Sequence, residues 1–497
     1  MHRFVAALFA LLLTLPSLAQ APRPTETGGG LYFGIFLKDT KLGHLHQELD
    51  SKARYKGKPS TKLTARSAMN IKMLGANGNI TTSEVVYLDP KTGATLAEET
   101  RTEASGRVTE VKATYTKDSV SFTAEIQGTK KSGTLRLKPG EVFLRDPSDM
   151  PGSKPVPGTR SKGKTFSPDT QTLVDMETVV GEKEPIVVAN RTVSAYKIQA
   201  VGPVPSTVYV DDEGEILLAQ VALGIEIRRL PKEAALAPEG KSVDLADSIG
   251  TRPTGVSLEK VARTSHHAVY ELGHVTRPLP PSDSVQRWEE LPVAGAEKGE
   301  KTLKVTVTPP LLPTTPTVKL FAQPSQAPER LRRYLKATEY VPSEDASFVA
   351  LARKVIGSQT DAARVAQLLA EHTYKTIKAD PSILAVRTAN DIRKDPRGVC
   401  RDYTTYFTTL ARAVGLPTKQ CTGVAYANGL FLYHAWPEVW VGTDASGNDL
   451  WVALEVTWGA PFADATHLKL TEGEITDVSS IAADMGRYSI KVVEVRE

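Results

Sequence analysis

The stretch Arg397-Gly398-Val399-Cys400-Arg401-Asp402-Tyr403 opens a helical pattern with a cysteine. Apolar residues recur after it at helical spacing and predict one buried face: Tyr403, Phe407, Leu410, Ala411 and Val414. Gly415 stands where a helix commonly ends, and Pro417 blocks its continuation. We therefore expect a helix whose first turn contains Cys400. The positive end of that helix favours thiolate over thiol, and its N–H groups can donate to an oxyanion.

A histidine and a carboxylate follow the cysteine along the chain. His434 lies in the aromatic, strand-like run 430–441, in which alternate residues, Trp436 among them, share a face. Pro437 interrupts that run, which predicts an edge strand or a bulge. Glu455 ends a second apolar run, where an unpaired carboxylate would be costly to bury. We expect the imidazole of His434 to be its partner across a hairpin. Together with the thiol, these groups are the minimum set for covalent cysteine catalysis.

These motifs resemble those of a known family. Residues from about 340 to 480 resemble the transglutaminase-like superfamily, in its bacterial secreted branch. The matching segments are the stretch quoted above, His434-Ala435-Trp436 with Glu438-Val439, Trp458-Gly459, and residues 461–470, which include Asp464 and His467.

The resemblance implies an α+β papain-like fold with Cys400 as the nucleophile and His434 as the base. The third position of the family is normally an aspartate in an Asp-Pro-Thr setting. This chain has Glu455-Val456-Thr457 there, so the residue that orients His434 is one methylene longer. We expect five further residues to support the site: Asp402, Tyr403, Trp436, Asp464 and His467. No cofactor and no metal ion is expected.

The length of 497 residues is enough for two to four domains. Short strand-like runs between turn residues predict a β-rich, meander or sandwich-like domain over 28–250. Residues 251–320 are interpreted as a second, small β region that ends in a proline-rich linker. The transglutaminase-like catalytic domain is placed at 330–480, and 481–497 is a C-terminal strand or tail. The fold class is therefore multidomain, with an all-β region before an α+β domain.

Local signals also predict individual turns and helices. Turn residues indicate hairpins at Asn77-Gly78, 89–93 and 211–214. Periodicity predicts helices over 345–356 and 361–377, the second with Thr360 as its N-cap.

The first 19 residues are interpreted as an export signal, because a short n-region precedes an apolar segment too short to span a bilayer. We expect a periplasmic or extracellular protein. The formal charge of +4 predicts no nucleic-acid partner, and no later segment predicts stable membrane insertion. With two cysteines the chain is not a disulfide scaffold, and we expect a free Cys400 and a buried Cys421.

The sequence therefore predicts an exported thiol enzyme that acts on amide bonds through a thioester. Its substrate would be a protein or peptide of the cell envelope. Hydrolysis by a protease or amidase ranks above transamidation, because water is abundant outside the cell and no amine pocket is visible in the sequence. The alternative is a non-catalytic envelope binding or scaffold protein that carries a transglutaminase-like module, motivated by the long β-rich region.

Overall fold

The computed structural model describes residues 30–497 apart from 74–75, 105–106, 127–128, 145–154, 169–170, 189–190, 203–205, 222–223, 239–243, 245, 247–248, 277–278, 293–298, 311–317, 381–382, 384–385, 445, 461 and 475–486. The export signal predicted at 1–19 and most of the proline-rich linker lie outside the described residues. The chain divides into two compact units, residues 2–245 and 246–497.

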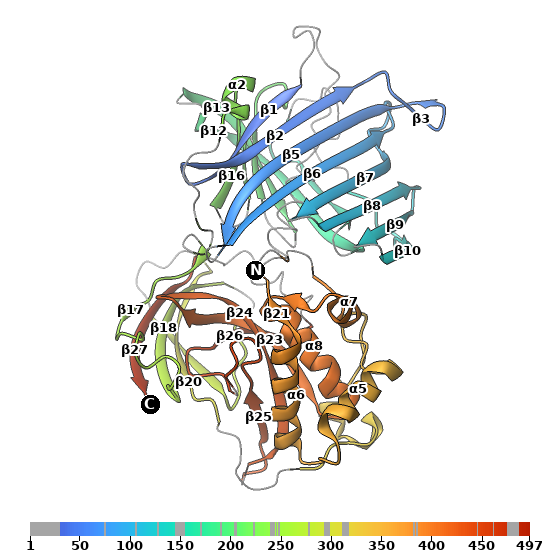
Figure 1. Cartoon of the computed structure of the whole chain (residues 1–497). Coiled ribbons are helices and arrows are strands. Elements are labelled where there is room, and N and C mark those ends of the chain that lie inside the picture. Colours follow the sequence, from blue (N-terminus) through green and yellow to red (C-terminus); the bar gives the residue numbers. More distant parts are fainter. Residues whose placement is uncertain are drawn as a thin grey trace. The chain divides into compact units, whose positions relative to one another are not determined.

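The N-terminal unit contains one 14-stranded antiparallel sheet (Figure 1). Its strand order is β10-β9-β8-β7-β6-β5-β2-β1-β16-β15-β14-β13-β12-β11. The strands are β1 (Leu31–Leu37), β2 (Thr40–Asp50), β5 (Thr61–Met73), β6 (Ala76–Leu88), β7 (Thr95–Ala104), β8 (Arg107–Tyr115), β9 (Ser119–Ile126), β10 (Thr129–Arg136), β11 (Arg160–Ser167), β12 (Thr172–Val188), β13 (Arg191–Val201), β14 (Ser206–Val210), β15 (Ile216–Val221) and β16 (Ile225–Arg229). A separate hairpin of β3 (Arg54–Tyr55) and β4 (Lys58–Pro59) and the short helix α2 (Lys232–Leu236) complete the described elements of this unit.

Strands from opposite ends of this sheet pack against each other. The ring of Phe122 in β9 lies 5.4 Å from that of Phe166 in β11, centroid to centroid, and both side chains are buried. Val111 and Ala113 of β8 belong to the same apolar cluster. Because one face of each strand is buried in this way, apolar residues alternate along the strands. The predicted all-β, sandwich-like meander is confirmed.

Two of the three predicted hairpin turns are present. The Asp89 carboxylate accepts from the N–H groups of Lys91 and Thr92 between β6 and β7, and residues 211–215 separate β14 from β15. The hairpin signalled by Asn77-Gly78 is present as the β5–β6 pair, but its turn is displaced, because both residues belong to β6 and pair with Lys72 and Ile71 of β5. The β5–β6 ladder therefore extends past the Asn-Gly pair, and local turn preference does not decide where it ends.

The C-terminal unit contains two larger sheets. The first has the order β17-β27-β18-β20-β19, and the second has the order β25-β24-β23-β26. The strands of the first are β17 (Thr254–Gly255), β18 (His267–Val275), β19 (Gln286–Leu291), β20 (Lys301–Val307) and β27 (Ser489–Arg496). Those of the second are β23 (Thr418–Ala427), β24 (Leu430–Thr443), β25 (Asp449–Ala453) and β26 (Leu468–Gly473). The short strands β21 (Lys378–Ala379) and β22 (Arg397–Gly398) form a parallel pair.

The described helices of this unit all precede the strands of the second sheet in the chain. They are η3 (Pro324–Gln326), α4 (Glu329–Arg332), α5 (Ala346–Ile356), α6 (Ala362–Thr376), α7 (Ala389–Lys394) and α8 (Cys400–Ala413). The two helices predicted after the linker are present as α5 and α6. The N-cap of α6 is Asp361, whose carboxylate accepts from the Arg364 N–H, so the choice of Thr360 is wrong by one residue. Among the described residues, no helix is both long and apolar enough to cross a membrane.

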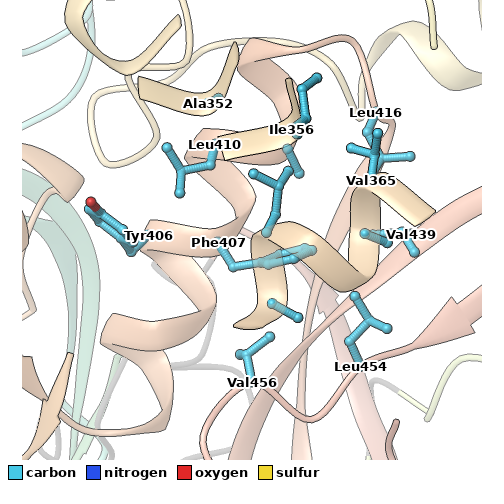
Figure 2. Packing of buried hydrophobic residues seen from close by; sticks show 14 of the residues in the cluster. Ala352, Ile356, Val365, Tyr406, Phe407, Leu410, Leu416, Val439, Leu454 and Val456 are labelled. Atoms are coloured by element: carbon cyan, nitrogen blue, oxygen red, sulfur yellow. The ribbon is translucent and has the colours of Figure 1, made fainter. Parts of the chain in front are cut away.

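Helix α8 lies in the main core of this unit (Figure 2). Phe407 and Leu410 are fully buried on its apolar face, together with Val439 of β24 and Val365 of α6. The helix ends as predicted, with Gly415 at a φ of +83°, a conformation that favours glycine. This packing fixes the axis of α8 and thereby the position of its first residue, Cys400.

Candidate active site

Cys400 is the first residue of α8, and its sulfur is not in a disulfide. The strand-like segment β22 leads into it and ends at Gly398. A Cβ atom at Gly398 would lie 2.5 Å from the Cβ of Asp402, so no larger residue fits there without a shift. At the helix start, the Val399 N–H donates to the Asp402 carboxylate over 2.9 Å. The Asp402 N–H donates in return to the Val399 carbonyl over 2.7 Å, and the two bonds hold the turn that presents Cys400.

Two of the predicted supporting residues fix the start of α8 from inside the protein. Asp402 accepts from Arg387 Nε over 3.0 Å, and both side chains are almost fully buried. Arg387 also donates to the backbone carbonyls of Asp395 and Arg397, which lie in the segment before Cys400. The Tyr403 hydroxyl donates to the Ile377 carbonyl over 2.7 Å. Asp402 and Tyr403 therefore position the nucleophile and do not contact it through these groups.

The His434 side chain and the Ala435 N–H lie within hydrogen-bonding reach of the Cys400 thiol. Burial alone would raise the pKa of the thiol, but these two partners and the nearby imidazole charge lower it below its usual range. Cys400 itself remains partly exposed, whereas His434 is buried. The geometry therefore favours a thiolate–imidazolium pair that a substrate can reach.

His434 lies in the middle of β24, and its Nε2 atom is 2.7 Å from Oε2 of Glu455. Since Nε2 faces the carboxylate, Nδ1 is the nitrogen left for the thiol. Burial lowers the pKa of His434, but the charges of Glu455 and Cys400 and their hydrogen bonds raise it above its usual range. Burial raises the pKa of Glu455, but its contacts with His434 and His467 hold it far below its usual range. The contact expected between the two residues is present.

The Glu455 carboxylate has four hydrogen-bond partners. Its Oε1 atom accepts from the N–H groups of Thr457 and Trp458 over 2.7 and 3.2 Å. Its Oε2 atom faces His434 and also Nε2 of His467, at 3.1 Å. Glu455 follows β25 by two residues and does not belong to a strand, so the expected hairpin geometry is corrected here. The extra methylene of a glutamate reaches from this turn to both imidazoles.

His467 extends the network away from the thiol. Its Nδ1 atom faces the backbone carbonyl and Oδ1 of Asp464, at 3.1 and 3.2 Å. Both ring nitrogens therefore face oxygen acceptors, an arrangement that favours the doubly protonated imidazolium. Burial opposes this charge, but Asp464 and Glu455 raise the pKa of His467. Asp464 is buried as well, and His467, Thr466 and Arg263 lower its pKa to about 2.

Aromatic rings enclose the imidazole of His434. The Trp458 ring is stacked on it with centroids 4.4 Å apart and 18° between the planes. The buried ring of Trp436 lies 6.1 Å from the imidazole and meets the ring of His467 edge to face at 5.1 Å. The predicted supporting residues Trp436, Asp464 and His467 are thus all assembled around His434 and Glu455.

Pro437 does not mark an edge strand, because β24 lies between β25 and β23. The ladder with β23 continues through Pro437, which is opposite Gln420, without a shift in register. On the other side, pairing with β25 ends at Ala453, opposite Glu438. The carbonyl of Pro437 accepts one last bond there, from the Leu454 N–H. A proline is tolerated because its missing N–H falls where the neighbouring strand ends.

Two groups of side chains have the proximity that a metal ion needs. One consists of His434, Glu455 and His467, and the other of Asp283, Glu438 and Glu472. In the first, the Nε2 atoms of His434 and His467 are already hydrogen-bonded to Oε2 of Glu455. In the second, the ammonium groups of Lys469 and Lys419 already lie among the carboxylates. Neither group has free donor atoms in the arrangement that the structure describes.

Cys421 is the second free cysteine, and it is fully buried in β23 opposite Trp436. Burial raises the pKa of its thiol well above the usual range. The prediction of a free Cys400 and a buried Cys421 is confirmed.

Sequence reasoning missed two residues of the site, Arg263 and Arg387. Arg387 precedes Cys400 by 13 residues and Arg263 by 137. Neither stands in a motif with the thiol or the imidazole. A buried aspartate at position 402 does imply a cationic partner, but no sequence signal identifies which arginine supplies it.

Residues 349–456 match the family model of the transglutaminase-like superfamily. A solved structure from Cytophaga hutchinsonii, described as a candidate cysteine protease, is 16% identical and aligns over 46% of this chain and 86% of its own, with a TM-score of 0.30. A candidate protease from Parabacteroides distasonis is 10% identical over 82% of this chain and 70% of its own, with a TM-score of 0.21. At these TM-scores the two structures carry no inference about this chain. No curated protein matches it.

Proposed function

We propose, since residues 349–456 form a transglutaminase-like domain, that this protein is a thiol enzyme that cleaves amide bonds of proteins or peptides. The main support is a row of three side chains in contact, from the Cys400 thiol through His434 to Glu455, with 2.7 Å between the last two. Each link has the role that covalent cysteine catalysis requires: a lowered thiol pKa, a base beside it, and a carboxylate that orients the base.

The first half of the reaction forms a thioester. The Cys400 thiolate attacks the carbonyl carbon of the substrate amide, and the new C–S bond gives a tetrahedral oxyanion. Backbone N–H groups of the first turn of α8, where Cys400 lies, are expected to stabilise it. The C–N bond then breaks, and the His434 imidazolium gives its proton to the departing ammonia or amine. Glu455 keeps the ring oriented throughout.

The second half releases the acyl group. His434 takes a proton from water, which attacks the thioester carbonyl, and the C–S bond breaks to give a carboxylic acid and the thiolate. A primary amine in place of water would give a new amide and therefore a cross-link. We propose hydrolysis as the main reaction, on envelope proteins or peptides outside the cytoplasm, on the strength of the export signal predicted at 1–19.

Alkylation of the purified protein with iodoacetamide across a pH series tests the thiol. We expect rapid modification of Cys400 well below the ordinary thiol pKa, and its loss in His434→Ala. A thiol that reacts only at the ordinary pH would support the non-catalytic scaffold. The reaction itself is tested with casein: new peptides or ammonia indicate hydrolysis, and incorporation of a fluorescent primary amine indicates transamidation. Unchanged product formation by Cys400→Ala would overturn the proposal.

A further inference from the structure

Arg263 lies outside the residues that match the family model, between β17 and β18 of the first sheet in the C-terminal unit. The segment that carries it is tied to the loop of the site. The Ser265 carbonyl accepts from the Ala465 N–H over 3.0 Å, and the Tyr270 hydroxyl donates to the Ala465 carbonyl over 2.9 Å. These two bonds hold the backbone near Arg263 beside the loop of Asp464 and His467.

The guanidinium of Arg263 makes three different contacts at once. Its Nη1 atom donates to Oδ2 of Asp464 over 2.7 Å, and its Nη2 atom donates to the Tyr426 carbonyl over 2.6 Å. Its Cζ atom also lies 3.9 Å from the centre of the Trp458 ring. A planar cation with several forked donors can satisfy all three, which a lysine ammonium cannot do in the same way.

Trp458 is therefore held between two partners. Arg263 contacts its ring, and the imidazole of His434 is stacked on it, 4.4 Å away. The same arginine neutralises Asp464, which holds the His467 imidazolium that faces Glu455. Two independent paths, one through the indole and one through alternating charges, thus connect Arg263 to the base of the site.

We propose that Arg263 is a positioning residue of the thiol site: it fixes Trp458 against His434 and closes the charge network at Asp464. This inference rests on the proposed function of Cys400 and His434. The Arg263 side chain is 46% exposed, whereas that of Asp464 is 7% exposed. Arg263 can therefore be replaced without opening the core, and its loss is expected to act on the site and not on the fold.

The test compares Arg263→Ala and Arg263→Lys with the wild type in the iodoacetamide pH series, with Cys400→Ala as the background for other nucleophiles. In Arg263→Ala the freed indole and the unneutralised Asp464 leave the imidazolium of His434 less well held. We expect the alkylation rate of Cys400 at about pH 6 to fall about tenfold, which corresponds to a thiol pKa about one unit higher. Arg263→Lys retains a cation near the indole and is expected to lie between the two.

Arg330→Ala is the matched control. Arg330 is also about half exposed in the same unit and binds one carboxylate, that of Asp449, through two nitrogens over 2.7 and 2.9 Å. We expect this variant to keep the wild-type pH profile. A low-pH reactive thiol in the wild type with the same profile in Arg263→Ala would overturn the inference and leave the proposed function standing. Equal effects of the two alanine variants would also overturn it, whereas an unreactive wild-type thiol would overturn the proposed function itself.

Discussion

The indole ring of Trp458 lies nearly parallel to the imidazole ring of His434, with 4.4 Å between the centroids. The indole is partly exposed and the imidazole is buried, so Trp458 stands between the base and solvent. Excluding water strengthens the electrostatic contacts of the imidazole. The stacked indole also restricts the imidazole ring to one plane. The stack therefore has a measurable consequence for the thiol.

Two replacements of Trp458 test whether its aromatic face against His434 contributes to the reaction. We expect Trp458→Ala to lower the rate of amide hydrolysis by about 10- to 100-fold, because the imidazole gains water and freedom of rotation. Trp458→Phe keeps an aromatic face and should retain most of the rate. Initial rates of peptide release measure both variants, and a wild-type rate in Trp458→Ala would show that the stack has no role in the reaction.

The Glu455 carboxylate is predicted to act through both its charge and its reach. Glu455→Gln removes the anion opposite His434, and we expect a rate loss of about 10⁴-fold, of the size seen when a triad carboxylate is neutralised. Glu455→Asp keeps the charge but withdraws the oxygens by about 1.5 Å, and should lose about 10²-fold. The pH dependence of the rate is the measurement.

The sign of the pH effect in Glu455→Gln follows from the direction of the shifts. Glu455 raises the pKa of His434 and thereby stabilises the thiolate of Cys400. Without that charge, the thiol pKa must rise, so the acid limb of the activity profile moves to higher pH. An acid limb at the wild-type position would contradict the role of Glu455.

The sequence was sufficient where the signal is local. The helical period after Cys400 and the left-handed position of Gly415 depend on neighbours within the same helix, and both are present. The pairing of His434 with Glu455 followed from the cost of burying a lone carboxylate. The turn does not lie at Asn77-Gly78, because the pairing of β5 with β6 continues through these two residues despite their local preference for a turn.

The contacts of Arg263 and Arg387 could not be predicted, because they depend on how distant segments pack. The place of Pro437 in an inner strand likewise depends on where β25 ends, which its own neighbours do not reveal. The position of β27 between β17 and β18 is a further case, since the last strand of the chain pairs with two strands that come more than 200 residues earlier.

The buried pair of Arg387 and Asp402 is expected to dominate the stability of the C-terminal unit. Asp402→Asn leaves the Arg387 guanidinium buried without its closest anion, and we expect the free energy of unfolding to fall by about 3–5 kcal/mol. The control is Arg397→Gln, which breaks a half-exposed pair with Asp395 and should cost less than about 1 kcal/mol. Urea denaturation measures both, and equal losses would show that burial of the pair is not decisive.

The N-terminal unit contains a carboxylate whose protonation should control its stability. Glu98 in β7 is buried, and burial raises its pKa from 4.5 to about 7, although a hydrogen bond with Tyr115 opposes the shift. Between these two values the folded state holds a proton that the unfolded state has released. The part of the unfolding free energy that is linked to Glu98 is therefore fully present below about pH 4.5. It is lost as the pH rises towards 7, by up to about 3 kcal/mol.

Glu98→Gln should remove this loss, because an amide keeps the shape of the protonated acid and does not ionise. We expect the variant to match the wild type at about pH 4.5 and to exceed it by up to about 3 kcal/mol at about pH 8. Urea denaturation at the two pH values, followed through the transition of the N-terminal unit, measures the difference. The control is Glu110→Gln, which breaks an exposed pair with Arg101 and should change stability by less than about 1 kcal/mol at either pH. If Glu98→Gln gave the same increment at both pH values, the buried carboxylate would not be the source of the pH dependence.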